Sequence, residues 1–223
     1  MKPGILPGIT QLILLLAVPL SFLPLIIYWC KQLAENKSYM VISIFWMING
    51  ILYLPDIFHW NWYEPVTLRI ILLYNLIDAP IICMIFYYAF EKKIFLQLIL
   101  AFMSFEAVII WWKGFNMHSN NIIIGVGSLL CLVLNIWGIG KYLKKVKHTA
   151  DDTVLVFVFA GFIFYYGLCV DIVLISRYLK LNIIQGDAIM LINYIAILVA
   201  TVLISFAFFK YAHPSQDFIT VKK

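Results

Sequence analysis

Charged residues are scarce in this sequence. Asp, Glu, Lys and Arg together make up 12% of the 223 residues, whereas soluble domains carry about 25%. Hydrophobic residues reach 64%. A water-soluble globule of this size keeps much of its surface exposed, so it could not hide so many apolar side chains from water. The composition therefore excludes a soluble fold and predicts an integral membrane protein.

Potential metal ligands are few and poorly placed. The cysteines all lie inside apolar runs without metal-ligand spacing, and the histidines all lie in connections or near the C-terminus: Cys30, Cys83, Cys131, Cys169, His59, His118, His148 and His213. A haem or metal centre needs several such side chains facing one another, so we expect none in the bundle. The net charge of +5 sits in short connections, where it orients a membrane protein. We therefore expect no nucleic-acid partner.

Long apolar runs dominate the chain. A helix crosses the hydrocarbon core with about 20 mostly apolar residues. Seven stretches qualify, at about 9–30, 38–55, 66–90, 94–112, 121–140, 153–176 and 188–210. The connections are too short for a folded extramembrane domain. We expect residues 1–223 to form one all-α membrane domain, a seven-transmembrane-helix bundle, with a short cytoplasmic tail at 211–223. The first stretch exceeds a signal-peptide core, so we expect it to be retained as a span.

Lysine and arginine are distributed unevenly between the two sides. Eleven of the sixteen lie on one side: Lys31, Lys37, Lys92, Lys93, Lys141, Lys144, Lys145, Lys147, Lys210, Lys222 and Lys223. The side richer in these residues is normally cytoplasmic. The bias predicts an outside N-terminus and a cytoplasmic C-terminus, which requires an odd number of spans. We expect a multi-pass protein of the plasma (inner) membrane.

Three acids fall inside predicted spans, where an ionisable side chain is costly and is a functional candidate. They are Asp78, Glu106 and Asp171. Asp78 is the deepest, roughly 18 Å along its helix from Val66. We expect its carboxyl to be protonated or to lie in a wet cavity. We expect Glu106 to turn outward or to pair with Lys113, without a functional role.

Helical spacing groups the polar residues further. In the third span, Tyr74, Asn75 and Asp78 share one face. The hypothesis is that six residues form a ligand site in a cavity open to the outside: Asp78, Asn75, Tyr74, Asp171, Asn193 and Tyr194. Pro80 would free a backbone carbonyl near that depth. The alternative is that these groups only hydrogen-bond between helices, which is common in membrane bundles.

The size, topology and short connections resemble those of microbial rhodopsins. Ala79-Pro80 in the third span and the aromatic segment 162–166 in the sixth are similar to that family's retinal pocket. The family binds retinal through a lysine midway along the seventh span, whereas here that span has only Lys210, at its end. The resemblance therefore covers architecture and implies a non-covalent apolar ligand in place of covalent retinal.

We therefore expect a non-enzymatic, receptor-like protein that binds a small or apolar ligand, such as a non-covalent lipid, carotenoid or retinoid. A signal would need a separate cytoplasmic or membrane partner protein, for which the basic connection 141–147 is a candidate surface; anionic lipid is the simpler explanation for that charge. One alternative is a transporter of small solutes or protons that uses Asp78, although no repeated halves are visible. Another is an intramembrane hydrolase that uses Asp78 and Asp171.

Overall fold

The chain forms helices throughout the part that the structure describes. The computed structural model describes residues 5–33, 36–58, 64–178 and 183–212, and within these the side chains of residues 5, 64–68, 71 and 171–187 lie outside the description. Its helices are α1 (Ile5–Ser21), α2 (Leu23–Cys30), α3 (Lys37–Ile57), α4 (Glu64–Phe90), α5 (Ile94–Lys113), α6 (Met117–Leu143), α7 (Ala150–Tyr178) and α8 (Ile183–Lys210). Seven candidate spans result, because α1 and α2 together make the first. The prediction of an all-helical, multi-pass membrane protein is thus confirmed at this level.

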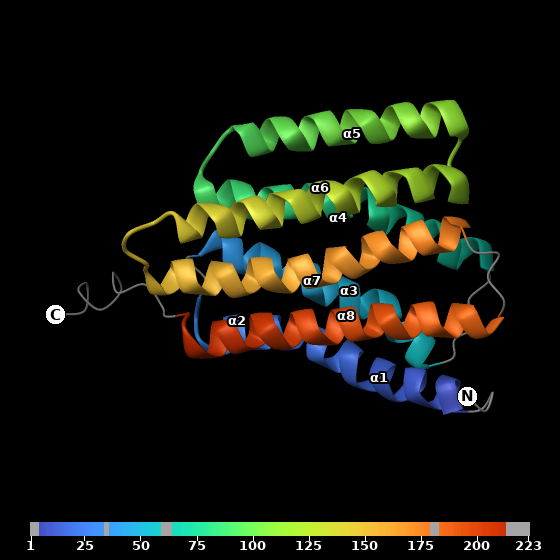
Figure 1. Ribbon diagram of the computed structural model, residues 1–223, viewed down its shortest axis with the longest axis horizontal. Coiled ribbons are helices and arrows are strands. Elements are labelled where there is room, and N and C mark those ends of the chain that lie inside the picture. Colours follow the sequence, from blue (N-terminus) through green and yellow to red (C-terminus); the bar gives the residue numbers. More distant parts are fainter. Residues whose placement is uncertain (1–4, 34–35, 59–63, 179–182, 213–223) are drawn as a thin grey trace.

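Helices that follow one another in the chain pack side by side. Each of α3 to α7 contacts the next helix, and α1 contacts both α3 and α8, so the bundle closes on itself. A further contact between α4 and α6 leaves α5 at the edge (Figure 1). Large apolar side chains on α5 are exposed, including Leu100, Val108 and Trp111. An outer surface of this kind suits hydrocarbon as solvent.

The first span is broken between α1 and α2, closer to its C-terminal end. Pro19 lies inside α1, and Pro24 stands in the first turn of α2, where its missing N–H costs little. α3 passes close to this break: a Cβ added to Gly50 would lie 2.0 Å from Oγ of Ser21 and 2.8 Å from the Phe22 ring. Glycine at position 50 therefore permits the close approach of α3 to the break.

Lys31 joins the first span to the last. Its ammonium donates to the main-chain carbonyls of Phe208 at 3.2 Å and Ala212 at 3.0 Å, and also to that of Phe209. Phe208 and Phe209 lie in the last turn of α8 and Ala212 lies just after it. At this end of a helix the last carbonyls have no intrahelical donor and a cation is favoured. In the sequence Lys31 contributes only to the positive charge of its connection, whereas in the structure it caps α8.

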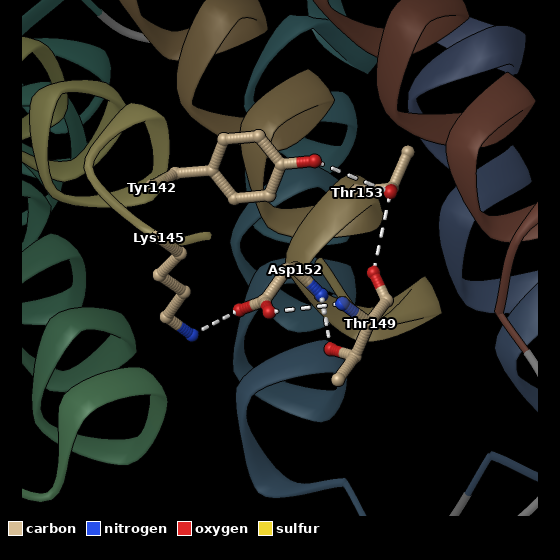
Figure 2. Close-up of polar contacts among 5 residues, drawn as sticks. All are labelled: Tyr142, Lys145, Thr149, Asp152 and Thr153. Carbon is tan, nitrogen blue, oxygen red and sulfur yellow. Dashed lines mark hydrogen bonds and ion pairs between the residues drawn. The ribbon is translucent and has the colours of Figure 1, made fainter. Parts of the chain in front are cut away.

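Figure 2 shows the start of α7, which carries a capping box. Oγ1 of Thr149 accepts from the N–H of Asp152 at 3.1 Å, and Oδ2 of Asp152 accepts from the N–H of Thr149 at 3.1 Å. Lys145, two residues after the end of α6, donates to the other carboxylate oxygen at 2.5 Å. The hydroxyls of Tyr142 and Thr153 lie 3.4 Å apart and add a link between the two helices.

Thr149→Ala should lower the free energy of unfolding by about 1 kcal/mol, since it removes a helix cap. Lys145→Ala should cost less than about 1 kcal/mol, because the Lys145 side chain is half exposed and its ion pair is screened by water. Unfolding monitored by circular dichroism during titration with a denaturing detergent measures both. A larger loss for Lys145→Ala than for Thr149→Ala would contradict this assignment.

Candidate functional site

A cavity of about 540 Å³ lies between five helices, α3, α4, α6, α7 and α8. Its lining consists of Ile51, Leu52, Tyr53, Leu54, Pro55, Asp56, Ile70, Tyr74, Asn75, Asp78, Ile124, Ser128, Tyr165, Tyr166, Cys169 and Asn193. These residues come from the end of α3, the first half of α4 and of α6, the second half of α7 and the first half of α8. The cavity thus occupies the end of the bundle at which α1 begins, on the right in Figure 1.

The structure brings together four of the six residues predicted to form a ligand site. Tyr74, Asn75, Asp78 and Asn193 all line the cavity. Tyr194 is buried beside it and contacts a lining residue, as described below. The side chain of the sixth, Asp171, lies outside the described residues. Ligand binding by these residues stays a prediction.

Asp78 is held by hydroxyl groups from two helices. Tyr166 of α7 donates to Oδ1 of Asp78 at 2.9 Å, and Tyr74, one turn before Asp78 on α4, approaches the same oxygen at 3.4 Å. The side-chain amide of Asn49, on α3, donates to the Tyr74 hydroxyl. The described residues offer Oδ2 no hydrogen bond. Two neutral donors therefore orient one carboxyl oxygen and leave the other for whatever occupies the cavity.

A second acid, Asp56, lines the cavity near the end of α3. Asp56 was predicted to begin a connection, but α3 continues through Pro55 to Ile57, which places Asp56 in the last helical turn. Proline there removes only one main-chain hydrogen bond, and the N–H of Phe58 still bonds to the carbonyl of Leu54 at 3.2 Å. The apolar pattern ended before the helix did, so the sequence pattern missed this acid.

Polar contacts tie α3 to α8 beside the cavity. The Tyr194 hydroxyl donates to Oδ2 of Asp56 at 3.1 Å, and the Asn193 amide donates to the Tyr53 hydroxyl at 2.7 Å. The rings of Tyr53 and Tyr194 meet edge to face, with centroids 5.5 Å apart. Asn193 and Tyr194 thus serve as links between helices, which is the alternative that the sequence left open.

Asn75 is likewise both a residue of the cavity lining and a link between helices. It lines the cavity, and its amide donates to Oδ1 of Asn120 on α6 at 3.0 Å. An amide that bonds across helices is ordinary in membrane bundles. Asp78 differs from Asn75 and Asn193 because its side chain is a carboxyl group that accepts from two tyrosine hydroxyls.

A layer of aromatic side chains lies one turn deeper than the lining. Trp46 stacks on Phe162, with centroids 5.8 Å apart, and meets Phe45 and Tyr165 edge to face. Trp46, Phe45 and Phe162 are fully buried. Since Tyr165 also lines the cavity, this layer supports the cavity wall and separates it from the opposite half of the bundle.

The expectation that Glu106 turns outward or pairs with Lys113 is wrong. Its side chain is only 5% exposed, on the same face of α5 as Phe102 and Ile109, and so turns into the bundle. Lys113 does not pair with it; the ammonium lies 4.0 Å from the ring centroid of Trp112. Seven residues separate Glu106 from Lys113, about 10 Å along the helix. Oε1 of Glu106 has no hydrogen-bond partner among the described residues, and Glu106 does not line the cavity.

Tyr53, Tyr165, Tyr166, Cys169 and Ser128 line the cavity but were not predicted as site residues. Tyrosine is common in buried helix faces, so nothing in the local sequence separates these hydroxyls from ordinary core. Within the described part of the chain, no group of three His, Cys, Asp or Glu side chains is close enough to hold a metal ion.

No protein-family model, curated protein or solved structure matches this chain. What the cavity can bind therefore follows from its own side chains.

Proposed function

We propose that this chain is a receptor-like membrane protein that binds a small apolar or amphipathic molecule, without covalent attachment, in the cavity around Asp78. The observation that carries the proposal is the carboxyl group of Asp78 at a 540 Å³ cavity, with one oxygen oriented by Tyr166 and Tyr74 and the other unused by the described residues. Concave, mostly apolar pockets with a few fixed polar groups are the usual form of small-molecule sites.

The cavity faces outside in this proposal. The end of the bundle opposite the cavity contains Lys31, Lys145 and most other lysines, and the positive-inside bias places that end in the cytoplasm. The membrane is the plasma membrane. The closed, sequential order of the helices supports a rhodopsin-like architecture, and Lys210, at the end of α8, is far from the cavity-lining part of that helix. A lipid, carotenoid or retinoid would therefore be held non-covalently.

Output would pass to a separate partner protein in contact with the cytoplasmic end. The connection after α6 carries exposed lysines at 144 and 147, whereas Lys145 is occupied by Asp152. Anionic lipid headgroups are the competing ligand for this charge.

A cavity-filling variant tests the proposal. Ile124→Trp places a large ring at the lining, whereas Val126→Trp, two residues along α6, places it on an exposed position facing away from the core. Protein purified in lipid nanodiscs should carry or take up a small molecule, detected by native mass spectrometry. Ile124→Trp should lose most of that occupancy and Val126→Trp should keep it. Equal occupancy in both variants, or none in the parent protein, would overturn the proposal.

The second candidate function is transport of a small solute or proton with Asp78 as its binding group, and the depth of Asp78 in α4 beside Pro80 favours it. A carrier must also open through the aromatic layer around Trp46 and Phe162. Uptake into proteoliposomes that disappears in Asp78→Asn would establish transport, whereas binding without flux would establish the receptor. The hydrolase alternative requires Asp171 beside Asp78, and the Asp171 side chain lies outside the described residues.

A further inference from the structure

The charged side chains among the described residues that line the cavity are all acidic. Two carboxyl groups, Asp56 and Asp78, line the cavity, and the described lining contains no lysine, arginine or histidine. Both acids are partnered by neutral donors: Tyr194 for Asp56, and Tyr166 with Tyr74 for Asp78. Asp56 is exposed in the last turn of α3, whereas Asp78 lies deep in its span, where a carboxylate without a cation is costly. An occupant that carries positive charge would supply the missing partner.

Aromatic faces surround the same space. Tyr53, Tyr74, Tyr165 and Tyr166 all line the cavity, and tyrosine rings attract ammonium groups through their quadrupole. The hydroxyl of Tyr74 accepts from Asn49 while approaching Asp78. Carboxylate and aromatic rings together form the type of environment that recognises an organic cation.

The rest of the lining is aliphatic. Ile51, Leu52, Leu54, Ile70 and Ile124 line the cavity together with the tyrosines. A strongly hydrated inorganic cation would gain nothing from these side chains, whereas the apolar body of an organic amine would be buried against them. An anionic ligand, such as a fatty acid or a phosphate, would meet two carboxyl groups and no cation among the described lining residues.

We propose that the ligand is a monoammonium compound with an apolar body, its ammonium on the free oxygen of Asp78 and its body against the aliphatic wall. This inference rests on the proposed function, because it names the ligand class of the same cavity. Asp56 adds a second carboxyl that draws cations toward the site.

The test uses three small probes of similar shape and different charge: 2-phenylethylammonium, 2-phenylethanol and 3-phenylpropionate. Each is titrated against the full chain in nanodiscs made of zwitterionic lipid, and binding is measured by equilibrium dialysis with empty nanodiscs subtracted. The ammonium should bind most tightly, the alcohol weakly and the carboxylate not at all. Asp78→Asn should weaken ammonium binding by about 30-fold or more, which is the scale of losing a buried charge partner. The affinity for the alcohol should stay unchanged.

Glu106→Gln is the matched control, since it neutralises another buried acid that does not line the cavity; ammonium binding should persist. Retained binding of 2-phenylethanol by Asp78→Asn would show that the cavity still forms in that variant. The comparison of the three probes on the parent protein does not depend on any variant. Alcohol or carboxylate binding as tightly as the ammonium, or an unchanged ammonium affinity in Asp78→Asn, would overturn the amine assignment but leave a binding cavity. Absence of binding by all three probes, with the Ile124→Trp and Val126→Trp variants indistinguishable, would overturn the proposed function itself.

Discussion

Trp46→Ala should lower the free energy of unfolding by about 3 kcal/mol, because the Trp46 side chain is fully buried at the centre of the bundle. Its ring stacks on Phe162 and contacts the edges of Phe45 and Tyr165. An unfolded helix in lipid keeps its apolar side chains in hydrocarbon, so the loss comes from packing and from the void left behind. We therefore expect the low end of the range that soluble cores show.

Two variants separate packing from other causes. Trp46→Phe should cost much less, since a ring remains and the indole N–H has no hydrogen-bond partner among the described residues. Trp111→Ala removes a tryptophan that is 88% exposed on α5 and should leave stability nearly unchanged. Unfolding by denaturing detergent, followed by circular dichroism, compares the three. A similar loss in Trp46→Ala and Trp111→Ala would show that the aromatic layer does not hold the bundle.

Gly138→Leu should destabilise the other half of the bundle by about 2 kcal/mol or more, through overpacking. A Cβ at position 138 would lie 2.8 Å from two ring atoms of Phe159 and 3.0 Å from Phe86. Both rings are fully buried and stack on each other at 4.8 Å, so neither can move aside easily. The cost therefore falls on the packing of α6 against α4 and α7.

Gly140→Leu is the matched control, because a Cβ at position 140 meets nothing within 4 Å. Both variants add the same side chain to α6, so their helix propensities change alike. Melting temperatures in nanodiscs should fall for Gly138→Leu and stay level or rise for Gly140→Leu. Equal changes would mean that propensity, and not the contact with Phe159, sets the effect.

The fold could be predicted from the sequence because each span depends only on a local stretch of residues. Each span needs only a continuous apolar stretch, and the helices match the predicted stretches except that most extend a few residues further at their ends. The break between α1 and α2 coincides with two prolines that the sequence displays. The extension of α3 beyond Pro55 was missed, because a last turn can be polar and still be helical.

Only the part of the candidate site that lies within one helix could be predicted from the sequence. Tyr74, Asn75 and Asp78 share a face through the 3.6-residue period, which holds within any one helix. Tyr166, on α7, donates to the Asp78 carboxyl from 88 positions away along the chain, and Asn49, on α3, donates to the Tyr74 hydroxyl from 25 positions away. The sequence of one span does not indicate which face of another span it will contact.

The sequence by itself determined that the chain lies in a membrane, that it crosses it with seven apolar helices and that a carboxyl group sits deep in the third. Only the tertiary structure decided that Asp78 opens onto a cavity, that Glu106 turns inward and that Lys31 caps α8. The physical reason is the distance along the chain over which each effect acts. Hydropathy and helical period act between neighbours in the chain, whereas the rotation of each helix is set by close packing against segments far away in sequence.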